Sequence, residues 1–221
     1  MNEAQTSRQA AVRRIHDISP TLRPGMAVWP GDVPFEHEQA LYLSRGDSVN
    51  LSSIRTSLHT GSHADSPLHY LEDGRPMDRV DISIFIGPCL LVSVDSPGLI
   101  RPQHLRAALA QQPERLIVHC NPGYSLDVFP DRYVHFSAEA AEAIGAAGVR
   151  LVGLDAPSVD HQNSKDLPAH HAFARHKVLI LESLVLDGVP DGWYELIAPP
   201  LKIANADGSP VRALLRELED G

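Results

Sequence analysis

The segment Val178–Leu186 reads VLILESLVL and restricts how this chain can fold more than any other stretch. A continuous apolar run of this length is typical of a strand that is buried on both faces, as in the sheet of an α/β protein. Its single carboxylate, Glu182, is then buried too, and an unpaired buried charge is strongly destabilising. We therefore expect Glu182 to be protonated, paired with a buried arginine or bound to a cation. The segment alone leaves the arginine and the metal ion equally open.

A second segment, residues 59–69, reads HTGSHADSPLH and concentrates side chains that bind metals. Neutral imidazole nitrogens and carboxylate oxygens are the ligands that zinc and similar ions take. Gly61 and Pro67 oppose a helix here, so an extended chain is expected. In an extended chain alternate side chains share a face, and the candidate ligands all have odd numbers. They are His59, His63, Asp65 and His69.

The spacing of His59 and His63 also predicts a bend between them. A straight strand would put their α-carbons about 13 Å apart, at roughly 3.3 Å per residue. That separation is too wide for two ligands at about 2.1 Å from one metal. Gly61 is the residue that permits a bend. For an isolated HxxxH pair, polar residues of a surface loop are an equal alternative, but Asp65 and His69 favour metal or acid–base chemistry.

Length and charge restrict the class of protein. With 221 residues the chain can bury a sizeable core, and the sequence contains no internal repeat or clear linker. We expect a loose polar arm over residues 1–13 and one domain over residues 14–221. The net charge of −9 argues against nucleic acid as the main partner. No apolar run approaches the roughly 20 residues of a membrane span, so no membrane partner is expected.

The chain start and the cysteines indicate a compartment. The first 16 residues, MNEAQTSRQAAVRRIH, contain no apolar segment of the kind found in a secretory signal peptide. Cys89 and Cys120 are far apart and form no CxxC motif, so buried free thiols are expected. A cytoplasmic location, where thiols stay reduced, fits both observations.

Strands and helices alternate in the predicted order, which indicates an α/β fold with a single domain. The loop 21–34 contains Trp29, either as a packing plug or as a platform that faces a ligand. Ser137 is expected to cap a helix that Gly148 ends. Strands are expected at 14–19, 35–43, 49–58, 83–95, 116–120, 149–155 and 178–186, and helices at 101–112, 137–147 and 211–219.

The stretch 167–176, LPAHHAFARH, adds three further histidines. His170, His171 and His176 are all possible metal ligands, and their spacing does not decide among them.

The segment HTGSHADSPLHY resembles the HxGxHxDxPxH signature of the cyclase-like metal-dependent hydrolases. Within that group the chain is similar to the bacterial kynurenine formamidases along nearly its whole length after residue 14. Segment 120–135, CNPGYSLDVFPDRYVH, matches them weakly, so the substrate can differ if this segment lines the pocket. The matching stretches are DISP (17–20), VWPGD (28–32), GLDAPSVD (153–160), NSKDLPAHH (163–171), ILESLVLDGVP (180–190) and YELIAPPLK (194–202).

The resemblance implies a swivelling β/β/α fold, a homodimer and two zinc ions per chain, with manganese or cobalt as alternatives. It implies that Asp65 bridges the two ions, that Glu182 reaches both, and that His69 is the catalytic acid/base. It also implies that Trp29 contacts the substrate. The remaining implied zinc ligands are His59, His63 and His170.

The implied activity is zinc-dependent hydrolysis of N-formyl-L-kynurenine to L-kynurenine and formate in tryptophan degradation. A hydrolase of the same superfamily that opens a cyclic amide such as isatin is the nearest alternative, because it would share every metal ligand. A non-catalytic metal-binding or assembly protein is the alternative from another class, and it would not need His69. A domain without metal would leave Glu182 unexplained.

Overall fold

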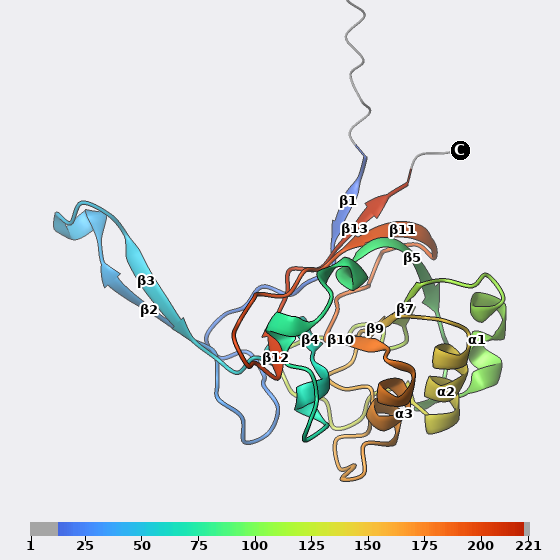
Figure 1. Ribbon diagram of the computed structural model, residues 1–221. Helices are drawn as coiled ribbons and strands as arrows, with labels where there is room; N and C mark the ends of the chain where they lie inside the picture. Colours follow the sequence, from blue (N-terminus) through green and yellow to red (C-terminus); the bar gives the residue numbers. More distant parts are fainter. Residues whose placement is uncertain (1–12, 219–221) are drawn as a thin grey trace, which may run out of the picture.

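A nine-stranded mixed sheet forms the centre of the fold, and the apolar strand that the sequence predicts at 178–186 is one of its interior strands (Figure 1). The computed structural model describes residues 13–218, so the arm predicted over residues 1–13 lies almost wholly outside the described residues. The strand order is β1-β13-β11-β5-β7-β9-β10-β4-β12. Strands β5, β7, β9 and β10 run parallel, and the neighbours on both sides are antiparallel. This single-domain α/β architecture confirms the predicted fold class.

The strands of the large sheet have the following bounds. They are β1 (Ile15–Asp17), β4 (His63–Asp65), β5 (Ile86–Ser93), β7 (Arg115–His119), β9 (Leu151–Leu154), β10 (Leu179–Glu182), β11 (Gly192–Ile197), β12 (Gly208–Pro210) and β13 (Leu214–Glu217). A separate parallel pair consists of β6 (Leu99–Ile100) and β8 (His135–Phe136). Short 3-10 helices are η1 (Leu43–Arg45), η2 (Pro67–His69), η3 (Met77–Arg79) and η4 (Ile82–Phe85).

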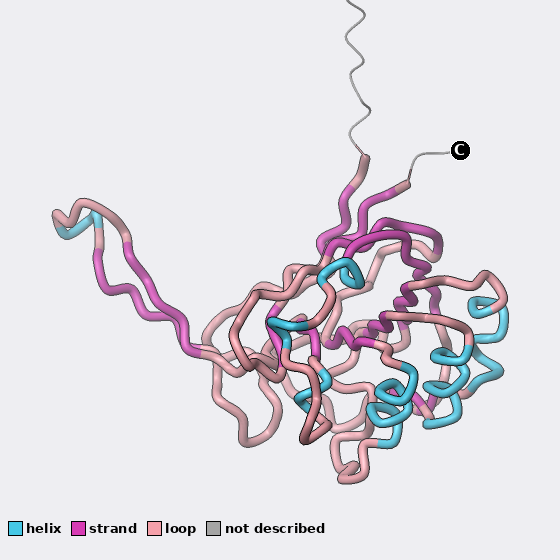
Figure 2. The backbone as a smooth tube through the Cα atoms, viewed as in Figure 1, coloured by secondary structure: helices cyan, strands magenta, loops and turns pink. Residues whose placement is uncertain are grey.

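Three α-helices lie together on one side of the parallel strands (Figures 1 and 2). They are α1 (Pro102–Leu109), α2 (Ala138–Ala146) and α3 (Pro168–His176). The predicted cap of α2 is confirmed, because Ser137 Oγ accepts a hydrogen bond from the Ala140 amide at 3.1 Å. Helix α3 is not among the predicted elements, because its buried face consists of two alanines, His170 and Phe173 and so carries a weak apolar signal.

The core has two layers, one on each face of the sheet. One layer packs Phe136, Ile144 and Phe173 between the sheet and the helices. The other packs Phe85 and Leu91 with other apolar residues on the opposite face. Burial on both faces explains why the central strands read as continuous apolar runs.

The predicted C-terminal helix over residues 211–219 is wrong. Residues 214–217 form β13, which pairs with β1 and β11 in the large sheet, and residue 219 lies outside the described part of the chain. Val211, Ala213 and Leu215 are buried while Arg212 between them is exposed, which is the period of a strand. Sheet pairing outweighs the helix propensity of the leucines, arginines and glutamates in this segment.

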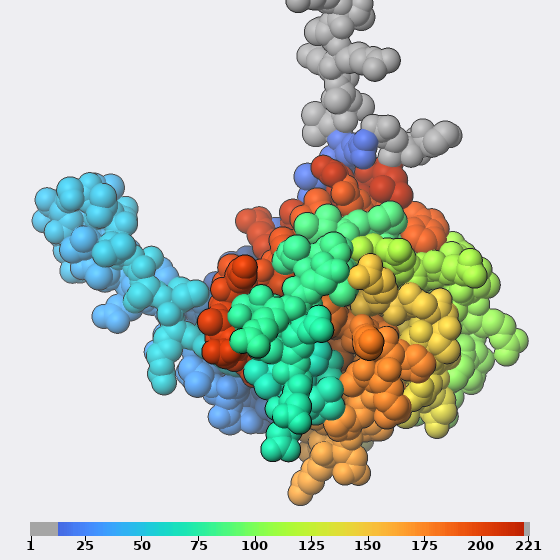
Figure 3. Space-filling view, in the orientation of Figure 1, coloured from blue at the N-terminus to red at the C-terminus, as the bar shows by residue number. Residues whose placement is uncertain are grey.

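A β-hairpin, called here the hairpin arm (residues 36–55), projects from the body of the protein (Figures 1 and 3). It consists of β2 (Glu36–Leu41) and β3 (Leu51–Arg55), which confirms two of the predicted strands. Every residue of β3 is exposed. The exposed apolar side chains of the arm are Leu43, Val49, Leu51 and Ile54.

The two cysteines, Cys89 and Cys120, are free and buried, as predicted. Among residues 13–218 there is no helix with the length and apolar character that crossing a bilayer requires.

Candidate metal centre

Two antiparallel strands build the floor of the candidate site. His63 and Asp65 are two residues apart on β4, so their side chains share one face of the strand. In the neighbouring strand β10, Glu182 lies directly opposite His63 in the register. All three side chains are buried. The pairing of β4 with β10 therefore brings together a histidine and two carboxylates that are far apart in sequence.

The predicted bend before β4 is confirmed at Gly61, whose φ is +65°. Glycine adopts this left-handed conformation without strain, whereas a Cβ here would lie 2.4 Å from Leu22 Cδ2 and would displace that side chain. The bend turns the chain so that His59 Nδ1 lies 2.9 Å from Asp65 Oδ1. His59 thus joins the cluster although it precedes the strand.

Helix α3 supplies another histidine from the opposite side. His170 Nε2 lies 3.5 Å from Asp65 Oδ2 and 3.8 Å from Glu182 Oε1. The Asp160 carboxylate accepts hydrogen bonds from the Ala169 and His170 amides, each at 3.0 Å, at the N-terminus of the helix. The same carboxylate lies 2.7 Å from His170 Nδ1, which fixes the ring orientation.

Of the three histidines left open in segment 167–176, only His170 enters the site. His176 Nε2 lies 2.6 Å from Glu142 Oε2, away from the cluster. His171 does not line the cavity.

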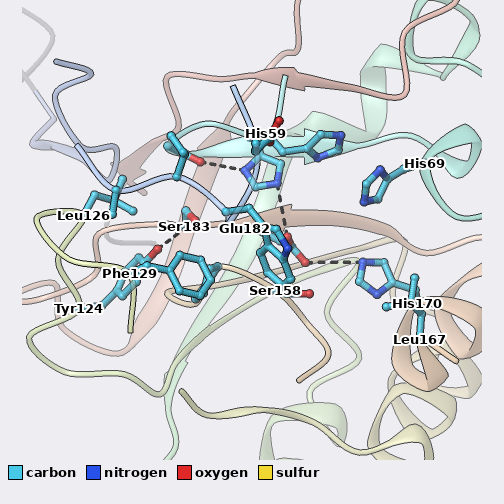
Figure 4. Close-up of a pocket in the computed structure, with 17 residues that line it drawn as sticks. His59, His69, Tyr124, Leu126, Phe129, Ser158, Leu167, His170, Glu182 and Ser183 are labelled. Atoms are coloured by element: carbon cyan, nitrogen blue, oxygen red, sulfur yellow. Dashed lines mark hydrogen bonds and ion pairs between the residues drawn. The ribbon is translucent and has the colours of Figure 1, made fainter. Parts of the chain in front are cut away.

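All three clustered histidines are held in the same way. One ring nitrogen of each faces an outer acceptor: the Gly61 carbonyl for His63, Asp160 for His170, and Asp207 for His59. The other nitrogen of each ring faces Asp65. Figure 4 shows His59, His69 and His170 around Glu182. Histidines that bind metals are commonly oriented by such an outer hydrogen bond.

Glu182 has no arginine partner among the described residues, which answers the question that its burial raises. Its Oε1 accepts a hydrogen bond from the Val159 amide at 2.7 Å, and its Oε2 lies 3.3 Å from His63 Nε2. The buried Arg115 points elsewhere and donates to the carbonyls of Ser83 and Ile84. The cluster therefore favours a cation over an arginine at Glu182.

One buried oxygen atom indicates that a metal ion fits this set of ligand atoms. Asp65 Oδ2 is buried and accepts no hydrogen bond, and a buried acceptor without a partner is costly. Two groups of metal-ligand atoms share Asp65: one with His59 and His69, and one with His63 and Glu182. Within each group the ligand atoms lie within 4.8 Å of one another. A cation between them would satisfy the orphaned oxygen.

The charges of the cluster also favour cations. Burial by itself lowers the pKa of His59 and of His170, but the carboxylates outweigh it, so the pKa of His59 rises to about 9 and that of His170 to about 10. Burial alone would raise the pKa of Asp65, yet its contacts with His170 and His59 hold it well below its usual range. The carboxylates thus stabilise positive charge on whatever group they face.

His69 lies at the edge of the cluster, at the end of η2 directly after β4. Its ring centroid is 4.0 Å from that of His59, and its Nδ1 lies 3.6 Å from Asp207 Oδ2. It is the most exposed of the site histidines. Partial burial and the neighbouring His59 lower its pKa against the opposing charge of Asp65, which favours the neutral ring. A neutral imidazole at this position can accept and return a proton.

Sequence reasoning missed two carboxylates of the site, Asp160 and Asp207. Asp160 orients His170, and Asp207 lies between His59 and His69. Asp160 stood within the stretch GLDAPSVD that carried the resemblance, which was the available signal. Asp207 stands in the polar turn before β12 and gave no signal.

A cavity of about 290 Å³ opens above the cluster. Trp29 lines it, and its ring packs edge-on against Phe129 at a centroid distance of 5.4 Å. Phe129 and Tyr124 both come from segment 120–135, which therefore does line the pocket (Figure 4). The cavity thus has an aromatic end and a histidine–carboxylate end.

This fold and this site define the class of metal-dependent hydrolases with a cyclase-type α/β fold. The sequence model of the Cyclase family matches residues 16–161, and the chain belongs to that family.

Solved structures of the same kind cover nearly the whole chain. A protein described as a potential metal-dependent hydrolase with cyclase activity is 25% identical, with a TM-score of 0.80 over 94% of this chain and 99% of that one. Isatin hydrolase A from Labrenzia aggregata is 27% identical, with a TM-score of 0.76 over 93% of this chain and 94% of that one. An isatin hydrolase bound to the product analogue thioisatinate is 22% identical and agrees in fold, with a TM-score of 0.78 over 93% of each chain.

Proposed function

We propose that this protein is a zinc-dependent kynurenine formamidase, an arylformamidase that hydrolyses N-formyl-L-kynurenine to L-kynurenine and formate. The observation that carries the proposal is the cluster around Asp65, with its orphaned buried oxygen, at the floor of a cavity with an aromatic end. An aryl amide has the matching shape, because its ring can lie against Trp29 and Phe129 while its carbonyl faces the cluster.

The proposed metal ligands are those that the cluster gathers. Asp65 is shared by both groups of ligand atoms and is the proposed bridge between two zinc ions. The other proposed ligands are His59, His63, His170 and Glu182. When bound, the ions supply Lewis acidity that polarises an amide carbonyl and acidifies water.

The residues of the chain then bind the substrate and move a proton. Trp29 and Phe129 hold the ring and exclude water from that end of the cavity. Hydrolysis adds water across the C–N bond, so one proton must pass from water to the leaving aniline nitrogen. His69 is the proposed carrier of that proton, because it lines the cavity beside His59 and its lowered pKa favours the neutral ring. Asp207 restrains its ring from the outer side.

Hydrolysis of N-formyl-L-kynurenine by the purified protein, with and without a chelator and beside a zinc assay, tests the proposal. We expect turnover that a chelator abolishes and zinc restores. Bound zinc without turnover of this substrate would discard the formamidase activity while retaining the metal site.

Hydrolysis of isatin is the second candidate function. The 27% identity to an isatin hydrolase over nearly the whole chain favours it. The same assay with isatin as substrate separates the two activities, because it compares turnover of a cyclic amide with turnover of an aryl formamide. Turnover of isatin that exceeds turnover of N-formyl-L-kynurenine would replace the first proposal by the second.

Replacing Asp160 by asparagine is expected to weaken zinc binding about 10- to 100-fold while the protein stays folded. Asparagine has one acceptor oxygen where the carboxylate has two, so it cannot serve His170 Nδ1 and the amides of Ala169 and His170 together, and the ring is held less firmly. Competition with a chromophoric chelator measures the affinity. Asp73→Asn, an exposed acid in a turn, is the matched control. Unchanged zinc affinity in Asp160→Asn would show that His170 needs no such support.

We also propose that the protein is a homodimer and that the hairpin arm contacts the second copy. An isolated two-stranded hairpin is marginally stable in water, and this one exposes apolar side chains without support from its own chain. Ile54→Asp is expected to shift the protein from twice the 24.1 kDa chain mass towards the chain mass. Light scattering measures the shift, with Val128→Asp, an exposed valine outside the arm, as control. A monomeric wild-type protein would contradict the dimer, and a dimeric Ile54→Asp would contradict the role of the arm.

A further inference from the structure

The cavity contains negative charge away from the metal cluster. None of the 17 residues that line it is a lysine or an arginine. Its two lining carboxylates are Glu182, which faces His63 and the Val159 amide, and Asp32. Asp32 therefore supplies the only acidic charge that the described cavity offers to a substrate outside the cluster.

Asp32 has a carboxylate oxygen available. Its Oδ1 accepts a hydrogen bond from the Val33 amide at 2.7 Å, and no ion pair joins it to any residue that the structure describes. Arg23, a cation earlier in the same loop, pairs instead with Asp127. The second carboxylate oxygen of Asp32 is thus left for a cavity occupant.

The loop that carries Asp32 is held in place. The Asp32 amide donates to the Trp29 carbonyl at 2.9 Å, so the carboxylate and the indole stand on one turn. The Ala27 amide donates to the Leu126 carbonyl at 2.7 Å, and Trp29 packs on Phe129, which ties the loop to segment 120–135. An aromatic surface and a carboxylate are therefore presented together and in advance of binding.

We infer that Asp32 binds the ammonium group of the substrate and so makes the enzyme selective for aryl formamides that carry a primary amine on a short side chain. This inference rests on the proposed function. When the aromatic ring of the substrate lies against Trp29, the substrate's ortho side chain lies along the turn that ends at Asp32. A substrate carboxylate finds no lysine or arginine among the lining residues, and the lining histidines belong to the metal cluster, so the carboxylate faces solvent and contributes little to recognition.

The test compares Asp32→Asn with the wild-type enzyme on two substrates. One is N-formyl-L-kynurenine, and the other is the same aryl formamide with hydrogen in place of the ammonium group. We expect kcat/KM of the variant to fall about 10- to 100-fold on the first substrate, mainly through KM, because a hydrogen bond between charged groups is lost. On the second substrate we expect less than a twofold change. Asp131→Asn, an exposed acid outside the cavity, is the control.

Two substrate derivatives provide an independent check on the wild-type enzyme. The methyl ester of N-formyl-L-kynurenine should be hydrolysed about as well as the acid, whereas acetylation of its α-amine should lower kcat/KM as strongly as Asp32→Asn does. Equal losses by the variant on both substrates, or a strong loss with the methyl ester, would overturn the inference.

Failure of the inference is distinguishable from failure of the proposed function. Good turnover of N-formyl-L-kynurenine with no selective effect of Asp32→Asn would reject the role of Asp32 in binding the ammonium group and would leave the proposed function intact. Without turnover, the dissociation constant of L-kynurenine is measured for both proteins by calorimetry. Weaker binding by Asp32→Asn would retain the ammonium site without the formamidase activity. No binding by the wild-type protein, or equal binding by both, would overturn the site as well.

Discussion

Asp65→Asn is expected to remove the bound metal and hydrolysis together. The Asp65 side chain is fully buried and belongs to both groups of metal-ligand atoms, so one substitution affects both proposed ions. Asparagine keeps the shape but loses the negative charge that balances a cation in a low-dielectric interior. We expect turnover to fall by at least about 10³-fold, since the proposed ions would supply the Lewis acidity that activates water and the amide carbonyl.

Metal analysis and turnover are measured on the same preparation of Asp65→Asn, and thermal unfolding checks that the variant folds. Asp81→Asn, an exposed acid at the start of η4, is the control for loss of one carboxylate. A variant that keeps both its zinc and its turnover would refute the role of Asp65 as the shared ligand.

His69→Ala is expected to keep the metal and to lose turnover by about 10²- to 10⁴-fold, the usual contribution of a general acid or base. His69 is exposed at the cavity edge, so its removal leaves no cavity in the core. The loss should fall on kcat, because Trp29 and the proposed metal centre would still hold the substrate.

Zinc content separates two roles for His69. Its ring nitrogen lies close enough to His59 and Asp65 to act as a ligand, so a metal role is geometrically open. Loss of zinc in His69→Ala would make it a ligand, and a near-normal kcat would remove the acid/base role. His161→Ala, an exposed histidine that does not line the cavity, is the control.

Local patterns predicted several parts of the site because they depend on near neighbours in sequence. The apolar run around Glu182 indicated a strand buried on both faces, and that strand is β10. The odd numbering of His63 and Asp65 predicted a shared face, and the 13 Å span of a straight chain predicted the bend at Gly61. Each inference used only the period of a strand or the conformational range of glycine.

Other parts depend on contacts between distant residues. The chain end was predicted as a helix from its leucines, arginines and glutamates, but its place between β1 and β11 makes it a strand. Asp207 lies 148 positions after His59, and a lone aspartate in a turn gives no sign of such a contact. Propensity describes a segment in isolation, whereas pairing and charge contacts depend on what the fold places beside it.

The sequence by itself determined the fold class of this protein, an α/β core, and the chemistry of its site, a set of imidazoles and carboxylates suited to a metal. Only the tertiary structure decided which of those groups meet. Pairing of β4 with β10 sets Glu182 opposite His63, and α3 turns His170 rather than His171 into the cluster. The structure alone also placed Asp32 beside Trp29 at the cavity. Sequence period fixes the face on which a side chain lies, but burial and charge select the partners across that face.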